Sequence, residues 1–184
     1  RSILIAGLSG TLAGMISMCM GEYVSVSTQK DSQKMALISE KQRLQNQYQH
    51  EFDYVQKKYE AQDIDPQLAK QATKELMEKD ALGTAVQERY GFNPNEFTSP
   101  YAAAIASFIS FPTGSILPMV AVTVSPANVR ILATAIAVLI ALLITGYFAA
   151  VLGKSNRIKS MIRNAAAGLL TMGVTYLIGQ LFAR

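Results

Sequence analysis

The sequence predicts an all-α membrane protein with four transmembrane helices and a helical cytoplasmic domain inserted after the first of them. Half of the 184 residues are hydrophobic and the mean hydropathy is +0.20, which is high for a water-soluble chain of this size. All 13 acidic residues lie between Glu22 and Glu96, and none occurs from Phe97 to Arg184. Charge is costly inside a bilayer, so this partition favours membrane-embedded segments.

The first segment, residues 1–29, is predicted to be a transmembrane helix. Ser2 to Ser27 carries a single charge, Glu22, and as a helix it can cross a hydrocarbon core of roughly 30 Å. Small residues recur along it at three- and four-residue steps, a spacing that lets another helix approach closely. Helix packing is sufficient to explain them: Gly7, Gly10, Gly14, Ser17 and Gly21.

Residues 30–98 are predicted to form a charged, helical domain in the cytoplasm. They include 12 of the 13 acidic residues and 10 of the 17 basic ones. Lys30 to Gln62 lacks glycine and proline and repeats apolar residues at helical spacing, which predicts one long helix or two with a break near Asn46. Asp65 and Pro66 then predict a new helix start, as N-cap and first helical residue.

Two further helices are expected in this domain. The first ends near Gly83, and a short second one ends at Tyr90, before Gly91. Apolar spacing predicts the inner face of the first at Leu68, Ala72, Leu76 and Met77.

Residues 99–184 are predicted to contain three more transmembrane helices. Prolines inside the first of these make it a candidate cavity lining, since such breaks are tolerated where neighbours or water satisfy the backbone. The predicted spans are Ser99–Val124 with Pro112, Gly114 and Pro118 inside it, Val129–Leu152, and Ile162–Phe182.

Basic residues indicate the topology. They crowd the 30–98 segment and the 154–163 loop, whereas the 125–128 turn has only Arg130 beside it. Both basic regions should face the cytoplasm. The two chain ends then lie on the far side, and a fifth span ahead of Arg1 is the simpler expectation for the full protein.

Glu22 and Met18 are the candidate ligands in the first span. They are four residues apart and so project from one face of the helix. A carboxylate beside a thioether suits a borderline or moderately soft divalent cation, and the carboxylate could exchange a proton for it. Alternatively, Glu22 marks the membrane interface and Met18 fills a packing gap.

The cytoplasmic domain offers further carboxylates, although mixed charge on a helix usually forms a solvated face. Met77 and Glu78 repeat the thioether and carboxylate pairing of the first span. His50, the single histidine, could ligate a metal beside Glu51, but a surface role is more common. The acidic side chains spread over these helices are Glu40, Glu51, Asp53, Glu60, Glu75 and Glu78.

Other function classes have little support. The sequence has no phosphate-binding loop, no di-iron Glu-x-x-His pair, no CxxC and no nucleophile elbow, so we expect no enzyme and no cofactor. Its net charge of +4 fits cytoplasmic loops beside membrane helices, and nucleic acid is a poor candidate partner. The single cysteine, Cys19, has no partner for an intrachain disulfide.

Three motifs together resemble the vacuolar iron transporter family. The run AGxxGxxAGxxSMxxGEYVSVSxQxD, at Ala6–Asp31, closely resembles its second membrane helix. DPQLAKQATKELMEKDALG, at Asp65–Gly83, is similar to the helix that closes its cytoplasmic domain, and TGSILP, at Thr113–Pro118, looks like part of its third membrane helix. The resemblance covers essentially the whole chain.

This resemblance implies a five-helix fold, whose first helix is not in this chain, and a homodimer. It implies a three-helix cytoplasmic metal-binding domain between the second and third spans. It also implies export of Fe²⁺, often with Mn²⁺, from the cytosol by proton antiport, along a path at the dimer interface.

The resemblance also implies site residues. The family's translocation methionine falls on Met18, and a glutamate that the family carries eight residues earlier is replaced here by Gly10. The cytoplasmic ligand positions fall on Glu40, Glu51, Met77 and Glu78, whereas their companion carboxylates fall on Arg43, Tyr54 and Ala81. An arginine there repels cations, so this domain is expected to bind fewer ions, to bind them more weakly, or to recruit Asp53 or Glu75.

The sequence therefore predicts a divalent metal exporter in which Glu40, Glu51, Met77 and Glu78 gather Fe²⁺ or Mn²⁺ and pass it to Glu22 and Met18 as protons return. The alternative is a non-transporting membrane scaffold or metal sensor acting through the cytoplasmic helices. A weaker third option is transport of another solute through the Pro112/Pro118 region. A bacterial inner membrane is the expected location, or the vacuolar membrane if the protein is eukaryotic.

Overall fold

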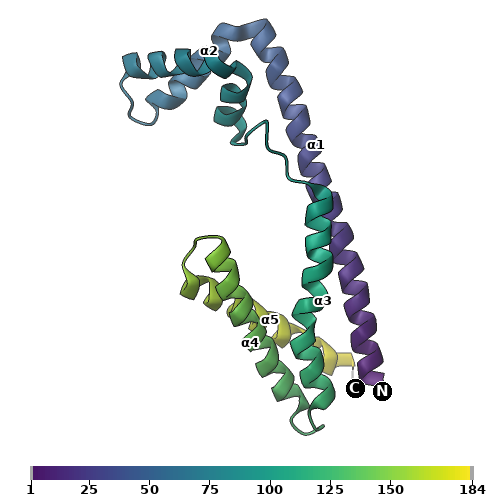
Figure 1. The fold of residues 1–184 in the computed structure, drawn as a ribbon. Coiled ribbons are helices and arrows are strands. Elements are labelled where there is room, and N and C mark those ends of the chain that lie inside the picture. The colour runs from purple at the N-terminus through teal and green to yellow at the C-terminus, as the bar shows by residue number, and fades with distance from the viewer. Residues whose placement is uncertain (1, 183–184) are drawn as a thin grey trace. The chain divides into compact units, whose positions relative to one another are not determined.

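Five helices account for nearly all of residues 2–182, the part of the chain that the computed structural model describes (Figure 1). No strand occurs in that range, and four of the helices (α1, α3, α4 and α5) are long and apolar enough to cross a membrane. The predicted all-α class with four spans is thereby confirmed. The helices are α1 (Ser2–Glu60), α2 (Pro66–Tyr90), α3 (Pro100–Val124), α4 (Arg130–Leu152) and α5 (Arg157–Phe182).

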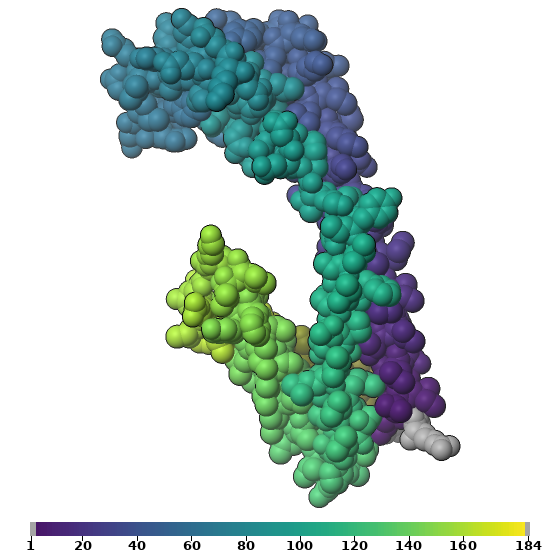
Figure 2. Space-filling model, viewed as in Figure 1, coloured from purple at the N-terminus to yellow at the C-terminus, as the bar shows by residue number. Residues whose placement is uncertain are grey.

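The chain divides into two compact units. One joins the chain up to Met18 with the chain from Ser107 onward, and the other is Cys19–Ala106. The second unit contains most of α1, all of α2 and the start of α3. Within it, α2 folds back against the end of α1, and Figure 2 shows the atoms of the two helices in direct contact.

Helix α1 extends from the predicted membrane segment into the predicted cytoplasmic domain. Its one break is at Gln47, which has non-helical dihedrals of φ −144° and ψ 46°, and this confirms the expected break near Asn46. The absence of glycine and proline from Lys30 to Gln62 explains why the helix otherwise continues.

Helix α2 starts as predicted. The Asp65 side chain accepts hydrogen bonds from the backbone amides of Gln67 and Leu68, at 2.9 and 3.4 Å, and Pro66 is the first helical residue. The helix continues past the expected end at Gly83, and its break lies three residues earlier, at Asp80. There the Asp80 carboxylate accepts a hydrogen bond from the Gly83 amide at 2.8 Å, which caps the second half.

The predicted inner face of α2 is displaced by one residue. Ala69, Thr73 and Met77 are the buried residues of its first half, whereas Leu68 and Leu76 are 58% and 42% exposed. The buried alanine and threonine are small, so this face can approach its neighbour more closely than a leucine face could. The expectation that both leucines point inward was wrong.

Two of the small residues in α1 pack closely on α3. A Cβ atom on Gly7 would collide with the side chain of Met119, and one on Gly14 would collide with the ring of Phe111. Gly10 and Gly21 have no such neighbour within 4 Å. The packing role expected of the glycine series therefore holds at two of these four positions within the chain.

Helices α4 and α5 form an antiparallel pair joined by a short turn. Glycine brings them together, since a Cβ atom on Gly146 would lie 2.9 Å from the Cα atom of Met161. Helix α5 begins at Arg157, five residues before the predicted start, because the Asn156 side chain accepts a hydrogen bond from the Lys159 amide at 3.0 Å.

Candidate functional site

A buried cluster of charged side chains joins α1 to α2 within the Cys19–Ala106 unit. Arg89, in the last turn of α2, lies with its Nε atom 3.2 Å from Glu40 Oε2, and its Nη2 atom donates a hydrogen bond to Glu51 Oε2. Eleven residues of unbroken helix would separate the two glutamate backbones by about 16 Å. The break at Gln47 falls between them and helps one guanidinium to reach both carboxylates.

The cluster is enclosed by protein. Glu40 and Glu51 are 0% and 1% exposed, and the Arg89 side chain is 17% exposed. The guanidinium carbon of Arg89 also lies 3.9 Å from the ring centroid of Tyr54, in cation–π contact. Arg89 is therefore held by two carboxylates and an aromatic face.

The carboxylates of the cluster titrate differently. Burial raises the pKa of Glu40 above its usual value, and the nearby Glu51 carboxylate raises it further against the opposing effect of Arg89. Burial also acts to raise the pKa of Glu51, but its contacts with Glu40 and Arg89 lower it overall. Glu40 therefore holds a proton more readily than Glu51, which stays ionised beside the guanidinium.

Hydrogen bonding within the cluster is incomplete. In the described part of the chain, neither oxygen of Glu40 accepts a hydrogen bond, and Arg89 Nε donates none. The 3.2 Å approach of Arg89 to Glu40 is thus an ion-pair contact without hydrogen-bond geometry. The Glu40 carboxyl group faces Glu51, with which a proton on Glu40 forms a hydrogen bond, and without that proton its oxygens could bind a further ligand.

Of the other candidate ligands in residues 30–98, Glu78 and His50 are exposed, whereas Met77 is buried. Met77 is buried, at 3% exposed, but the Glu78 side chain is 64% exposed and its carboxylate lies 3.9 Å from Lys74 Nζ. His50 is exposed, with Nδ1 3.4 Å from Glu51 Oε1. Among residues 2–182, no set of three or more histidine, cysteine, aspartate or glutamate side chains is arranged to hold a metal ion.

The two alternative carboxylates also lie outside the cluster. Asp53 accepts a hydrogen bond from Gln49 Nε2 at 2.8 Å, and Glu75 accepts one from Gln71 Nε2 at 3.0 Å. Both pairs are exposed and belong to single turns of their own helices. These residues therefore have the solvated surroundings that mixed helical charge usually has.

Met18 and Glu22 are one helical turn apart in α1. Met18 is 47% exposed in the single chain, and Glu22 is also exposed. Glu22 remains the one charged residue between Ser2 and Ser27. Within residues 2–182 neither side chain is covered by another part of the chain, so both are available to a metal ion or to a second molecule.

Arg89 and Tyr54 belong to the site although the sequence does not predict them there. The resemblance marks Tyr54 only as the position of a lost carboxylate, and Arg89 is one of many basic residues in the domain. A signal for Arg89 is present, because it follows the buried residues Ala85 and Val86 by four and three positions. This spacing places a charged residue on the buried face of α2, where it needs a buried partner.

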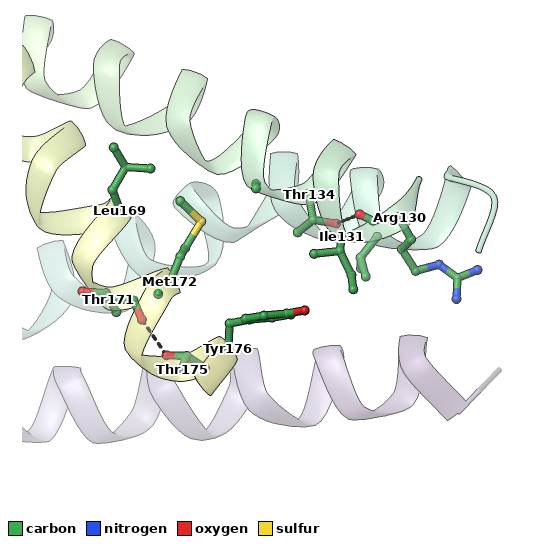
Figure 3. A pocket seen from close by; sticks show the side chains of 11 residues that line it. Arg130, Ile131, Thr134, Leu169, Thr171, Met172, Thr175 and Tyr176 are labelled. Atoms are coloured by element: carbon green, nitrogen blue, oxygen red, sulfur yellow. Dashed lines mark hydrogen bonds between the residues drawn. The ribbon is translucent and has the colours of Figure 1, made fainter. Parts of the chain in front are cut away.

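A cavity of about 710 Å³ lies between α4 and α5 (Figure 3). Apolar and hydroxyl side chains line it, among them Ile131, Thr134, Leu169, Met172 and Tyr176, with Arg130 at one end. From α3 it has only Val122. The expectation that the proline-containing span lines a cavity through Pro112 and Pro118 is not met by this one.

Comparison with known proteins identifies the family. The model of the VIT family matches residues 1–180. A vacuolar iron transporter of Acanthamoeba castellanii is 33% identical over 180 residues, which cover 97% of this chain and 69% of that protein. Vacuolar iron transporter homolog 2.1 of Arabidopsis thaliana is 30% identical, and homolog 1 of Oryza sativa 31% identical, covering 96% and 99% of this chain and 65% and 61% of those relatives. The chain spans about two thirds of the length of these relatives, and it belongs to the VIT family.

Proposed function

We propose that this protein carries a divalent metal, Fe²⁺ and also Mn²⁺, out of the cytosol across a membrane in exchange for protons. The observation that carries the proposal is the family match over residues 1–180, which includes all four membrane-length helices. The names of the relatives as iron transporters support the choice of metal. They also favour a vacuolar membrane, and the comparisons offer no support for a bacterial inner membrane.

The proposed membrane step uses Met18 and Glu22. A thioether and a carboxylate one turn apart offer a soft and a hard ligand, a combination suited to Fe²⁺ and Mn²⁺. A carboxylate that gives up its metal can take a proton, so Glu22 links the two fluxes. Both side chains are exposed in the single chain, which is consistent with a homodimer that completes the path.

The proposed cytoplasmic step uses Glu40, Glu51, Met77 and Glu78 to collect the metal. The convergence of Glu40 and Glu51 on one cation supports the first half of this set. Met77 and Glu78 have weaker support, because the Glu78 carboxylate points to solvent beside Lys74. Participation of the Glu78 carboxylate requires a rearrangement of α2, and the break at Asp80 is where the helix could bend.

Flux through proteoliposomes tests the membrane step. The protein is reconstituted with an inward-directed Mn²⁺ gradient and an opposing proton gradient, and internal Mn²⁺ is followed by fluorescence quenching. We expect Glu22→Gln to lower the flux at least tenfold and to remove its dependence on the proton gradient. Glu96→Gln is the matched control, because it removes one exposed carboxylate from a segment between helices. Equal flux in wild type and Glu22→Gln, with the same pH dependence, would exclude the role of Glu22.

One observation favours the alternative of a membrane scaffold or sensor. The carboxylate pair that should receive the metal is already occupied by the chain's own guanidinium, Arg89. A scaffold would show no Fe²⁺ or Mn²⁺ flux in the same liposomes under any gradient. The metal transporter would show flux that saturates with metal concentration.

A further inference from the structure

Arg89 occupies the position in the buried cluster where a bound cation would be expected. It fills the space between two carboxylates that resemblance places among the metal ligands of the cytoplasmic domain. Two carboxylates that converge in a buried place form a hard-oxygen site for a divalent cation. In this chain, the cation already there belongs to the protein.

Arg89 lies at the edge of the cluster, where its side chain can reach solvent. It is in the last turn of α2, next to the final helical residue Tyr90, and its side chain is 17% exposed. It donates a hydrogen bond to Glu51 but has only an unaligned contact with Glu40. Within the described residues, neither oxygen of Glu40 therefore accepts a hydrogen bond from Arg89, although Glu40 is fully buried.

We propose that Arg89 is a resident, displaceable cation that closes the Glu40–Glu51 pair to divalent metal, so that Fe²⁺ or Mn²⁺ binds there only when the guanidinium leaves. The proposal rests on the proposed function and adds a means of regulation to its cytoplasmic step. Tyr54 supplies the face on which the guanidinium rests while the pair is closed. When the guanidinium moves away from the pair, the Glu40 oxygens are the first ligands that become free to bind metal.

The closed state lowers the apparent affinity for metal. A site that is competent for only a fraction of the time binds with its intrinsic constant divided by that fraction. The wild-type domain therefore takes up metal weakly, and only at concentrations high enough to compete with an intramolecular partner. Weak occupancy of this kind would make the domain respond to excess metal and ignore trace amounts.

The test measures Mn²⁺ binding by the full chain in detergent, from the loss of the free Mn²⁺ signal in electron paramagnetic resonance. We expect Arg89→Gln to bind one Mn²⁺ at least roughly tenfold more tightly than wild type. Lys70→Gln is the matched control, since it removes one exposed positive charge from α2 that acts on neither carboxylate of the pair. Its affinity should stay within about threefold of wild type. Adding Glu40→Gln to Arg89→Gln should abolish the gain.

Two further variants keep the proposal falsifiable if Arg89→Gln does not fold. Tyr54→Leu retains the charges of Glu40, Glu51 and Arg89 and removes only the cation–π contact of the guanidinium, so it should also tighten Mn²⁺ binding. Arg89→Lys keeps the charge and loses the planar fork, and should fall between wild type and Arg89→Gln. Equal Mn²⁺ affinity in wild type and these variants would overturn the proposal, as would a gain that survives Glu40→Gln.

The same samples separate this inference from the transport proposal. Wild-type liposomes without metal flux, together with tighter binding by Arg89→Gln, would refute transport and leave the displaceable cation in place. Flux in wild type with unchanged binding by Arg89→Gln would do the reverse. Metal-dependent protection of α2 against thermal unfolding, measured in Arg89→Gln and wild type, provides a readout that needs no transport.

Discussion

Removal of Arg89 in the absence of metal should loosen the contact between α1 and α2. Arg89→Gln leaves Glu40 and Glu51, which are 0% and 1% exposed, without their shared cation. Deleting one partner of a buried ion pair costs about 3–5 kcal/mol. Because Glu40 already tends to hold a proton, its charge need not stay buried, and we expect the lower end of that range.

Hydrogen exchange in EDTA measures this loss directly. At about 1.4 kcal/mol for each factor of ten, amide protection of the α2 segment after Asp80 should fall by roughly a hundredfold at pH 7. Lys70→Gln, which removes an exposed positive charge from α2, should leave it nearly unchanged. Protection of α3 to α5 reports on global unfolding and should hardly differ, so the effect is local.

Acid should reduce the difference between the variant and wild type. The folded-state pKa of Glu51 lies below its ordinary value in wild type, so the contribution of Glu51 is present above its unfolded pKa and is lost as pH falls through the folded one. In Arg89→Gln the part of that depression caused by Arg89 is lost, while Glu40 and His50 still lower the pKa of Glu51, and protonation of the pair relieves repulsion. After correction for intrinsic exchange, the hundredfold difference in amide protection between wild type and Arg89→Gln should decrease from pH 7 to pH 4. A gap below threefold at pH 7, or one that widens in acid, would refute this account of the cluster.

Three further predictions concern other parts of the fold. Gly14→Ala should lower the melting temperature, because the new Cβ atom would collide with Phe111 at a cost of about 1–3 kcal/mol. Gly10→Ala is the control and should be nearly neutral, since nothing lies within 4 Å of its Cβ position. Equal melting temperatures of the two variants would refute the packing assignment. Asp65→Ala should cost about 1 kcal/mol and speed amide exchange in the first turn of α2, and unchanged exchange there would contradict the cap. Burial raises the pKa of Tyr59 to about 12, so the stabilisation that Tyr59 gives the folded state is complete below pH 10 and is lost between pH 10 and 12. Tyr59→Phe should therefore remove a late component from the alkaline rise in tyrosinate absorbance. An identical titration curve in the variant would disprove this.

Most of the fold could be predicted from local chemistry. The N-cap at Asp65 and the absence of glycine from Lys30 to Gln62 act within a few residues, whereas the acid-free run after Glu96 acts through the composition of a long segment. Each of these predictions holds. The inner face of α2 was misplaced because leucine is a weak guide when the neighbouring helix is close. Small residues at Ala69 and Thr73 decide that contact.

The site was harder to predict, because its geometry depends on contacts between distant residues. Glu40 and Glu51 could be chosen by resemblance, but their shared cation comes from a residue 38 positions beyond Glu51. The break at Gln47 could be placed approximately from sequence. Only the structure shows its effect, which is to bring two carboxylates to one guanidinium. Tyr54 stands where the resemblance leads us to expect a ligand, and it is instead the surface on which Arg89 rests.

The central claim is that this member of the VIT family moves divalent metal across a membrane in exchange for protons. Its most direct test is simultaneous measurement of Mn²⁺ and proton movement in liposomes that contain the wild-type protein, with protein-free liposomes as reference. We expect saturable Mn²⁺ uptake, with protons moving in the opposite direction, and faster uptake under an opposing proton gradient. Mn²⁺ and proton fluxes no greater than those of protein-free liposomes, for protein shown to be folded and inserted, would contradict it.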